Sequence, residues 1–192
     1  MKKEIQEYYF KNDAQWRQWL QANHEQSEGI YLIFYAVAHE NESMMWEEAV
    51  KVALCYGWID STVKSLGNGK RRQYFCQRKA KSVWSKVNKD HIKSLKKDGL
   101  MHNYGLKSIS VAKKNGSWTA LDGVEKGIIP PNLQAAFDQK PEAFRNYQNF
   151  TRGQRKSYLY YLNQAKREET KSKRIKEIVS LCAKNIKGRN SW

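Results

Sequence analysis

The amino-acid sequence predicts an α+β fold, in which a small antiparallel sheet packs against helices and an all-helical module follows. Three observations lead to this prediction. A hairpin pattern with a glycine turn lies in the first half, apolar residues recur at helical spacing around it, and the chain reads as helical after Pro130-Pro131. The length of 192 residues fits one large domain, or a domain with an appendage. We therefore expect an α+β domain over residues 1–128 and a helical module over residues 129–192.

The first elements alternate between helix and strand. Asp13 precedes two tryptophans and a leucine at helical spacing, which predicts a short helix capped by Asp13 and ending near residue 24. The apolar run 30–38 is too short for a typical buried helix and predicts a central strand. A second helix is expected from Ser43, with Gly57 at the position after its end.

A basic hairpin follows these elements. Residues 58–65 and 71–78 alternate in polarity around the glycine-containing turn 66–70, which predicts two antiparallel strands. Ser85 is expected to cap a helix that carries Val87, Ile92 and Leu95 on its apolar side. A further helix is expected to end near residue 116.

Four short helices are expected after the proline pair. One of them opens at Pro141, and the next has the capping-box spacing of Thr151 and Gln154. The last places Ile175 and Cys182 on a single apolar stripe.

The net charge of +16 is concentrated in two blocks. Residues 64–97 hold twelve basic side chains against one acid, and residues 151–192 hold twelve against three, whereas residues 1–60 are acidic. A compact fold with this excess repels itself, which favours an anionic partner. The alternative is a solvated lysine-rich surface that keeps the protein soluble.

Several classes of function are excluded or unsupported by the sequence. No apolar run reaches the roughly 20 residues of a membrane-spanning helix, and the start of the chain lacks the core of a signal peptide, so we expect a cytoplasmic protein. The three cysteines form no C-x-x-C pair, and the histidines have no zinc-type spacing, so we expect neither a disulfide framework nor a metal. No phosphate-binding loop and no recognisable nucleophile with its base are present, so we expect binding rather than catalysis, and no cofactor.

The segment 57–88 is the strongest local signal, because it interleaves aromatic and cationic side chains. Cations attract phosphates, and exposed aromatic rings stack on bases, so this pattern predicts a nucleic-acid surface. The alternative is that these aromatic residues are core. The cations expected to contact nucleic acid are Lys64, Arg71, Arg72, Lys79 and Lys81 near the hairpin, with Arg155, Lys156, Lys166, Arg167, Lys171 and Arg174 from the helical module joining them on one surface.

A second interpretation of the same segment is a pocket for a small anionic metabolite. In it Arg78 would recognise the anion, and Asp60 would orient the ligand or move a proton. The structural alternative for Asp60 is a carboxylate that fixes the hairpin through hydrogen bonds. The side chains expected to line the pocket are Trp58, Asp60, Ser61, Arg78, Ser82, Trp84, Ser85 and Asn88.

The same residues carry a family resemblance. The run Gly57-Trp58-Ile59-Asp60-Ser61, with Arg78, Trp84-Ser85 and Asn88 and the later run from Asn149 to Ile175, resembles the YdeI/OmpD-associated family of bacterial bacteriocin-protection proteins. The resemblance implies a YjbR/CyaY-like, frataxin-related fold for the amino-terminal part. Relatives of that fold have been linked to DNA binding through winged β-elements. The sequence departs from the family pattern at Cys76-Gln77 and Arg152-Gly153.

Taken together, the residues and the resemblance lead to one expected function and two alternatives. We expect a non-enzymatic protein of the stress or bacteriocin-protection type that binds an anionic partner, most of all DNA or RNA. The first alternative is the metabolite pocket around Asp60, Arg78 and Trp84, which would leave room for an enzymatic role. The second is docking of the basic module to an acidic envelope protein.

Overall fold

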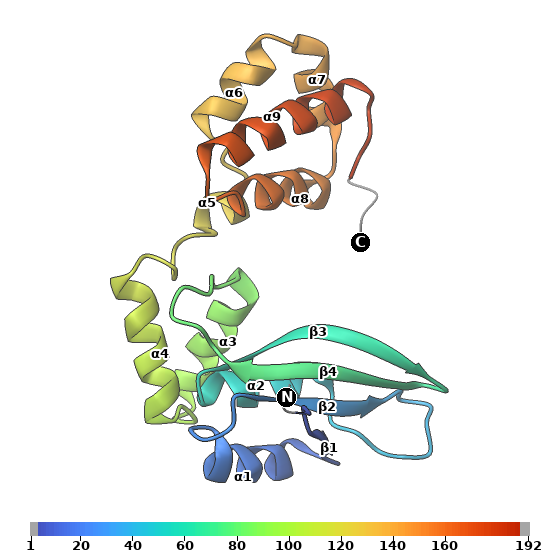
Figure 1. Ribbon diagram of the computed structural model, residues 1–192, viewed down its shortest axis with the longest axis vertical. Coiled ribbons are helices and arrows are strands. Elements are labelled where there is room, and N and C mark those ends of the chain that lie inside the picture. The colour runs from blue at the N-terminus through green and yellow to red at the C-terminus, as the bar shows by residue number, and fades with distance from the viewer. Residues whose placement is uncertain (1–3, 189–192) are drawn as a thin grey trace. The chain divides into compact units, whose positions relative to one another are not determined.

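The protein is described by a computed structural model that covers residues 4–188, and it divides into two compact units (Figure 1). Unit 1 ends at Thr119 and unit 2 begins at Ala120. The α+β fold class is confirmed, with the sheet in unit 1 and helices alone in the described part of unit 2. The division falls before the expected boundary at residue 128, because Leu121 and Val124 pack into the helical core of unit 2.

The sheet of unit 1 has four strands in the order β1-β2-β4-β3. β3 and β4 form the expected hairpin, and β4 also pairs antiparallel with β2. β1 pairs parallel with β2, so the sheet is mixed and the prediction of a purely antiparallel sheet was wrong. The strands are β1 (Glu7–Tyr9), β2 (Gly29–Tyr35), β3 (Trp58–Gly67) and β4 (Lys70–Gln77).

Four helices complete the regular structure of unit 1: α1 (Asp13–Asn23), α2 (Trp46–Cys55), α3 (Lys86–Lys97) and α4 (Asn103–Lys114). The N-cap of α1 is Asn12, whose side chain accepts a hydrogen bond from the backbone N–H of Gln15, so the expected cap at Asp13 was wrong by one residue. Ser85 caps α3 as expected, through the backbone N–H of Asn88.

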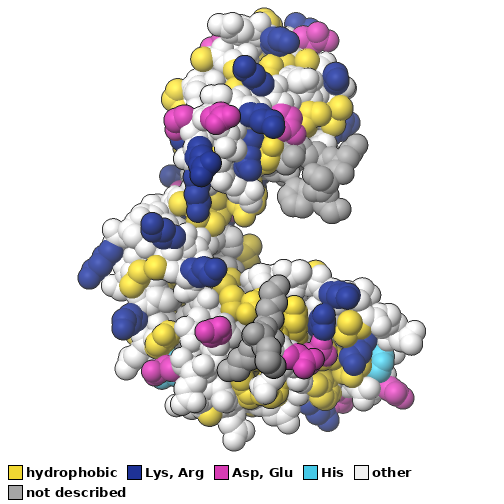
Figure 2. All heavy atoms as spheres, in the orientation of Figure 1, with side chains coloured by type: hydrophobic (Ala, Val, Ile, Leu, Met, Phe, Trp, Pro, Cys, Tyr) yellow, Lys and Arg dark blue, Asp and Glu magenta, His cyan; other side chains and the backbone are white. Residues whose placement is uncertain are grey.

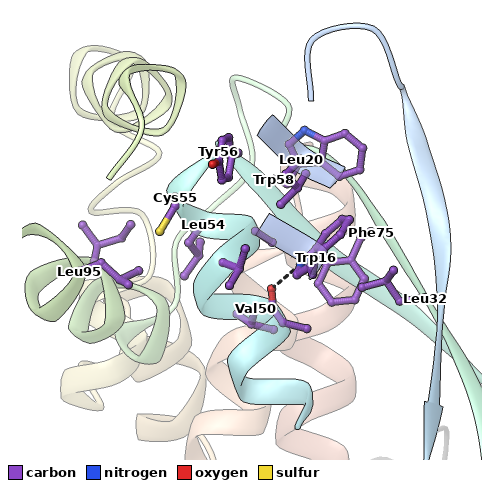
Figure 3. Packing of buried hydrophobic residues seen from close by; sticks show 14 of the residues in the cluster. Trp16, Leu20, Leu32, Val50, Leu54, Cys55, Tyr56, Trp58, Phe75 and Leu95 are labelled. Atoms are coloured by element: carbon purple, nitrogen blue, oxygen red, sulfur yellow. Dashed lines mark hydrogen bonds between the residues drawn. The ribbon is translucent and has the colours of Figure 1, made fainter. Parts of the chain in front are cut away.

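The core of unit 1 is formed by α1, α2 and one face of the sheet, with further buried residues from α3 and α4 (Figure 3). Trp16 and Leu20 from α1 meet Leu32 from β2 and Phe75 from β4, and all four are fully buried. The indole Nε1 of Trp16 donates to the backbone oxygen of Ala49 at 3.1 Å, which ties α1 to α2. This core fixes which side chains of the hairpin point inward.

α2 and α4 approach each other closely at a glycine. A Cβ built on Gly105 would lie 2.1 Å from the backbone oxygen of Cys55, far inside contact distance. Gly57 has φ +72 just after α2, the left-handed conformation that glycine adopts most readily at a helix end. The absence of a side chain at Gly105 therefore lets α4 pack directly against the end of α2, and Gly57 lets the chain turn immediately after α2.

Unit 2 contains five helices among its described residues: α5 (Asp122–Lys126), α6 (Pro131–Asp138), α7 (Pro141–Asn149), α8 (Arg152–Asn163) and α9 (Glu168–Ala183). The four expected after the proline pair are confirmed, and so is the capping box between Thr151 and Gln154. The short helix α5 was not expected. Phe137, Tyr147 and Ile178 lie in a separate hydrophobic core.

Candidate nucleic-acid interface

The cations of the hairpin divide between the two faces of the sheet. Lys64 pairs with Arg72 across β3 and β4, and the next pair, Ser65 with Arg71, must face the opposite way because side chains alternate along a strand. Lys64 and Arg72 therefore share the face that carries Tyr31, whereas Arg71 lies on the other. The structure does not bring the three predicted contact residues of the hairpin onto one face.

Two of these arginines are already engaged with neighbours. Arg72 forms an ion pair with Glu7, and its guanidinium lies 4.4 Å from the centroid of the Tyr31 ring. The Arg71 guanidinium lies 5.5 Å from the Phe34 ring and lines a groove of about 990 Å³ with Met45. The charge of Arg72 is thus partly balanced within the protein.

Three of the four aromatic residues in the segment 57–88 that were expected to stack on bases are core residues, and the fourth, Tyr74, is half-buried. Trp58, Phe75 and Trp84 each have an exposed fraction of 0%. A ring with no accessible face cannot stack on a base, so a stacking role for Trp58 and Trp84 does not fit the structure. Large aromatic residues are usually buried in the core, and a buried ring is not available for binding.

The residues of the expected metabolite pocket form two groups. Asp60 accepts hydrogen bonds from Trp46 Nε1 at 3.1 Å and Gln73 Nε2 at 2.5 Å, so its carboxylate fastens the hairpin to α2. Arg78 lies on Trp84 in the loop before α3, with its guanidinium 3.8 Å from the ring centroid. Ser85 and Asn88 form the cap of α3, Ser61 is exposed, and Ser82 is half-buried. Whether a ligand joins the two groups stays a prediction.

Arg78 is held inside this loop rather than extended toward solvent. Its Nη1 donates to the backbone oxygen of Val83 at 3.0 Å. Burial lowers the pKa of Arg78 to about 10, and the negative charge of Asp60 opposes that shift. The Nε and Nη2 atoms of Arg78 and Nε1 of Trp84 are buried with no hydrogen-bond partner among residues 4–188. Arg78 and Trp84 thus pack on each other inside the loop, while Lys79 and Lys81 next to it are exposed.

The largest group of aligned cations in unit 1 lies on α3. It was not among the contact residues predicted from the sequence. Positions on a helix advance by about 100° per residue, so lysines at spacings of three and four residues fall within one stripe about 100° wide. Ile92 and Leu95 are buried on another side of the helix. The lysines of this stripe are Lys86, Lys89, Lys93, Lys96 and Lys97. A helical-wheel count of lysines would have found them.

The stripe continues onto α4 through a tryptophan. Trp118 is half-buried, with Lys89 Nζ at 5.4 Å and Lys113 Nζ at 5.6 Å from its ring centroid. The rings of Trp84 and Trp118 lie 5.0 Å apart, so the buried loop residue supports the more exposed one. We use the term lysine surface for the α3 stripe, Lys113 and Trp118. Figure 2 shows Lys and Arg side chains over the α3 and α4 side of unit 1.

A single acid of α3 lies among these lysines. Asp90 forms an ion pair with Lys86 at 2.5 Å, and the hydrogen bond from Lys86 lowers the pKa of Asp90, assisted by the charge of Lys93. Asp90 therefore stays ionised and balances one lysine. Val87 is 56% exposed, so its expected place on the apolar side of α3 was wrong.

The predicted contact residues of unit 2 differ in how far they are already paired. Lys171 pairs with Glu168 at 2.6 Å and Lys156 with Glu125 at 2.7 Å. The Arg174 guanidinium lies 4.2 Å from the Tyr161 ring and donates to the backbone oxygen of that residue. The other three predicted contact residues are half-buried Arg155 and the exposed pair Lys166 and Arg167.

Within residues 4–188, no group of three or more His, Cys, Asp or Glu side chains is placed to hold a metal ion. Over the same residues, no helix combines the length and the apolar character needed to cross a bilayer.

The comparisons with known proteins assign the two units to different families. A model described as a domain of unknown function, DUF8412, matches residues 8–108, more than half of the chain. The model "Bacteriocin-protection, YdeI or OmpD-Associated" matches residues 126–185. These matches define an α+β domain of uncharacterised type joined to a helical module of the YdeI/OmpD-associated kind. The chain belongs to the DUF8412 family.

The two matches also correct the resemblance described for the sequence. The YdeI/OmpD-associated likeness holds for the carboxy-terminal part. The YjbR/CyaY-like assignment of the amino-terminal part is not supported, because the DUF8412 model matches there instead. No curated protein and no solved structure matches the chain.

Proposed function

We propose that the protein binds nucleic acid through the lysine surface of unit 1. The observation that supports this most is the alignment of the five α3 lysines in one stripe, continued by Lys113 beside Trp118. The activity proposed is binding to the phosphate backbone, with no chemical reaction.

The charge of this part of unit 1 supports a polyanionic partner. Residues 78–118 hold eleven Lys and Arg against two Asp. Ordinary solubility does not need so large an excess of one sign, and the self-repulsion is relieved when an anion binds. Lys93, Lys96 and Lys97 are exposed.

The shape of the surface favours a long partner over a small one. The lysines extend along α3 from residue 86 to residue 97, about 16 Å at 1.5 Å per residue. Charges distributed over such a length suit a polymer with regularly repeated phosphates. A single small anion would engage one end of the stripe only.

Two triple variants with equal loss of charge test the surface. The variant K93Q/K96Q/K97Q changes exposed lysines of α3, and K64Q/K70Q/R71Q changes the hairpin. Fluorescence anisotropy with labelled duplex and single-stranded DNA and RNA, at several salt concentrations, gives the affinity and its salt dependence. Affinity falls as salt rises, and we expect the α3 variant to make this negative slope of log affinity against log salt shallower by about 0.9 for each duplex phosphate that it no longer neutralises, or by about 0.7 for single strands.

The outcomes distinguish the proposed surface from its competitors. A weakening confined to the hairpin variant would reject the lysine surface in favour of the hairpin. If the wild-type chain binds none of the nucleic acids at low salt, the proposed function is wrong. If poly-glutamate competes as well as DNA at equal charge concentration, the partner is an acidic protein instead.

The family that matches unit 2 suggests a biological role for such binding. Its description as a bacteriocin-protection family supports a protective role at the level of class only. We infer that nucleic-acid binding by unit 1 is the molecular activity behind that role. Measuring survival under bacteriocin challenge in cells that produce wild-type protein or K93Q/K96Q/K97Q tests this link.

A further inference from the structure

A small cavity in unit 2 combines four cationic side chains with a buried hydroxyl group. It has a volume of about 300 Å³ and lies between α5, the end of α7 and the first turns of α8. Its lining includes Glu125, Tyr147, Arg152, Arg155 and Lys156. This size is at the lower end of that of ligand sites.

Three of the four cations of the cavity come from the start of α8, and the fourth, Lys126, is the last residue of α5. Arg152 is the first residue of α8, and Arg155 and Lys156 follow within the next turn. The positive end of the helix dipole lies at the same place, and backbone N–H groups there favour an anion. Four positive side chains therefore line this small volume, which lies next to the N-terminus of α8.

Glu125 balances part of this charge. Its carboxylate pairs with Lys156 Nζ at 2.7 Å, and its backbone oxygen accepts from Arg152 Nη2 at 3.1 Å. The Arg155 side chain has no hydrogen bond or ion pair with any residue described, and it is half-buried. The cavity thus keeps an excess of positive charge and one guanidinium with all its donors available.

Tyr147 supplies the observation that points to a ligand. Its side chain is 2% exposed, and its hydroxyl oxygen has no hydrogen-bond partner among residues 4–188. The ring is fixed by Phe137, with the two centroids 5.0 Å apart. Buried hydroxyl groups are nearly always paired, and an unpaired one is costly unless something else satisfies it.

The hydroxyl group of Tyr147 also stays protonated. Burial raises its pKa to about 12, and the positive charge of Arg155 opposes that shift. Arg155 and Tyr147 both line the cavity. At neutral pH the tyrosine can donate a hydrogen bond to an anion that also meets Arg155.

We propose that this cavity binds a phosphate group carried by a small molecule or by the end of a nucleic-acid strand. Arg155 and Lys156 contact its oxygens, the Tyr147 hydroxyl group donates to one of them, and the N-terminus of α8 adds its dipole. The site lies in unit 2 and is separate from the lysine surface, so it goes beyond the function proposed above.

Binding of phosphate to the full chain tests the site. Isothermal titration with inorganic phosphate is compared for wild type, R155Q, Y147F and the control K173Q, an exposed lysine outside the cavity. We expect R155Q to weaken binding about tenfold or more, since it removes a charge-assisted hydrogen bond. Y147F should weaken it several-fold, and K173Q should leave it unchanged.

The Y147F variant separates a loss of phosphate binding from a loss of folding. The hydroxyl group that it removes has no partner in the described part of the protein, so thermal unfolding of the ligand-free variant should occur at or above the wild-type temperature. Weaker phosphate binding by a protein of undiminished stability then reports on the site alone. Equal binding by wild type and R155Q, or no binding by wild type at millimolar phosphate, overturns the proposal.

A second pair of probes separates the two sources of the phosphate group. A short oligonucleotide with a 5′-phosphate is compared with the same strand ending in a hydroxyl group, both titrated into K93Q/K96Q/K97Q. Stronger binding of the phosphorylated strand, abolished in R155Q, supports a strand end as ligand. Binding of inorganic phosphate with no preference between the strands supports a small molecule.

Discussion

The guanidinium of Arg78 lies 3.8 Å from the centroid of the Trp84 ring, inside the loop that leads from the hairpin into α3. Both residues were predicted from the sequence to meet a ligand. In the structure they contact each other, and Trp84 in turn packs on Trp118, while their contact with a ligand stays a prediction. The pair therefore connects the core of unit 1 to the lysine surface without forming part of its exposed side.

Replacing Trp84 tests this structural role. Because the ring is fully buried, we expect W84A to lower the free energy of unfolding of unit 1 by about 3–5 kcal/mol. Exposed Lys81 in the same loop serves as the control, and K81A should change the free energy of unfolding by less than about 0.5 kcal/mol. Urea unfolding followed by tryptophan fluorescence measures both. A W84A protein as stable as wild type would show that the ring is not a core residue.

The close approach of α4 to α2 gives a second expectation. Alanine at position 105 would place a Cβ 2.1 Å from the backbone oxygen of Cys55, so the helices must separate. We expect G105A to cost about 1–3 kcal/mol or more in thermal or urea unfolding.

Gly153 is the matched control for this substitution. It lies in α8, and a Cβ there meets nothing within 4 Å, so G153A should be neutral or stabilise by up to about 1 kcal/mol. Similar effects of the two substitutions would contradict the close contact between α2 and α4.

The cap of α1 can be assigned by two alanine substitutions. Asn12 accepts the hydrogen bond from Gln15, so N12A should destabilise unit 1 by about 1 kcal/mol. Asp13 lies in the first turn and contributes through the helix dipole only, so D13A should cost about 0.3–1 kcal/mol and less in high salt. A larger destabilisation by D13A than by N12A would restore Asp13 as the cap.

The buried thiol of Cys182 makes the free energy of unfolding of unit 2 depend on pH in the alkaline range. Burial raises the pKa of this thiol from 9.0 to about 12 in the folded chain. Between those values the unfolded chain loses the proton and the folded chain keeps it, so raising the pH lowers the free energy of unfolding. Urea unfolding at pH 8 and pH 11 measures the change, and C182A should show a smaller one. An equal change in C182A would assign the effect to other groups, such as Tyr147.

Much of the fold could be read from the sequence because its signals are local. The hairpin, the Ser85 cap and the box of Thr151 and Gln154 each depend on residues within a few positions of one another. β1 could not be found this way, since a strand of three residues is stable only through its pairing with β2. The short helix α5 likewise depends on the packing of Leu121 and Val124 against distant helices.

The candidate site was harder to predict because charge and exposure are decided by tertiary structure. The basic blocks were visible in the sequence, and neighbouring Arg71 and Arg72 of a strand must face opposite ways, but which of the two faces the core covers is decided only by the tertiary structure. The α3 lysines show a helical period that a wheel would reveal. The unpaired hydroxyl group of Tyr147 has no sequence signal, because it results from the packing of α7 against its neighbours.

The separation of the two hydrophobic cores at Thr119 has an evolutionary consequence. A gene cut at that point would leave each half with its own complete interior, so either half could be inherited, duplicated or joined to a new neighbour without repairing the other. The matching of distinct families to the two halves is what such exchange of modules would leave behind.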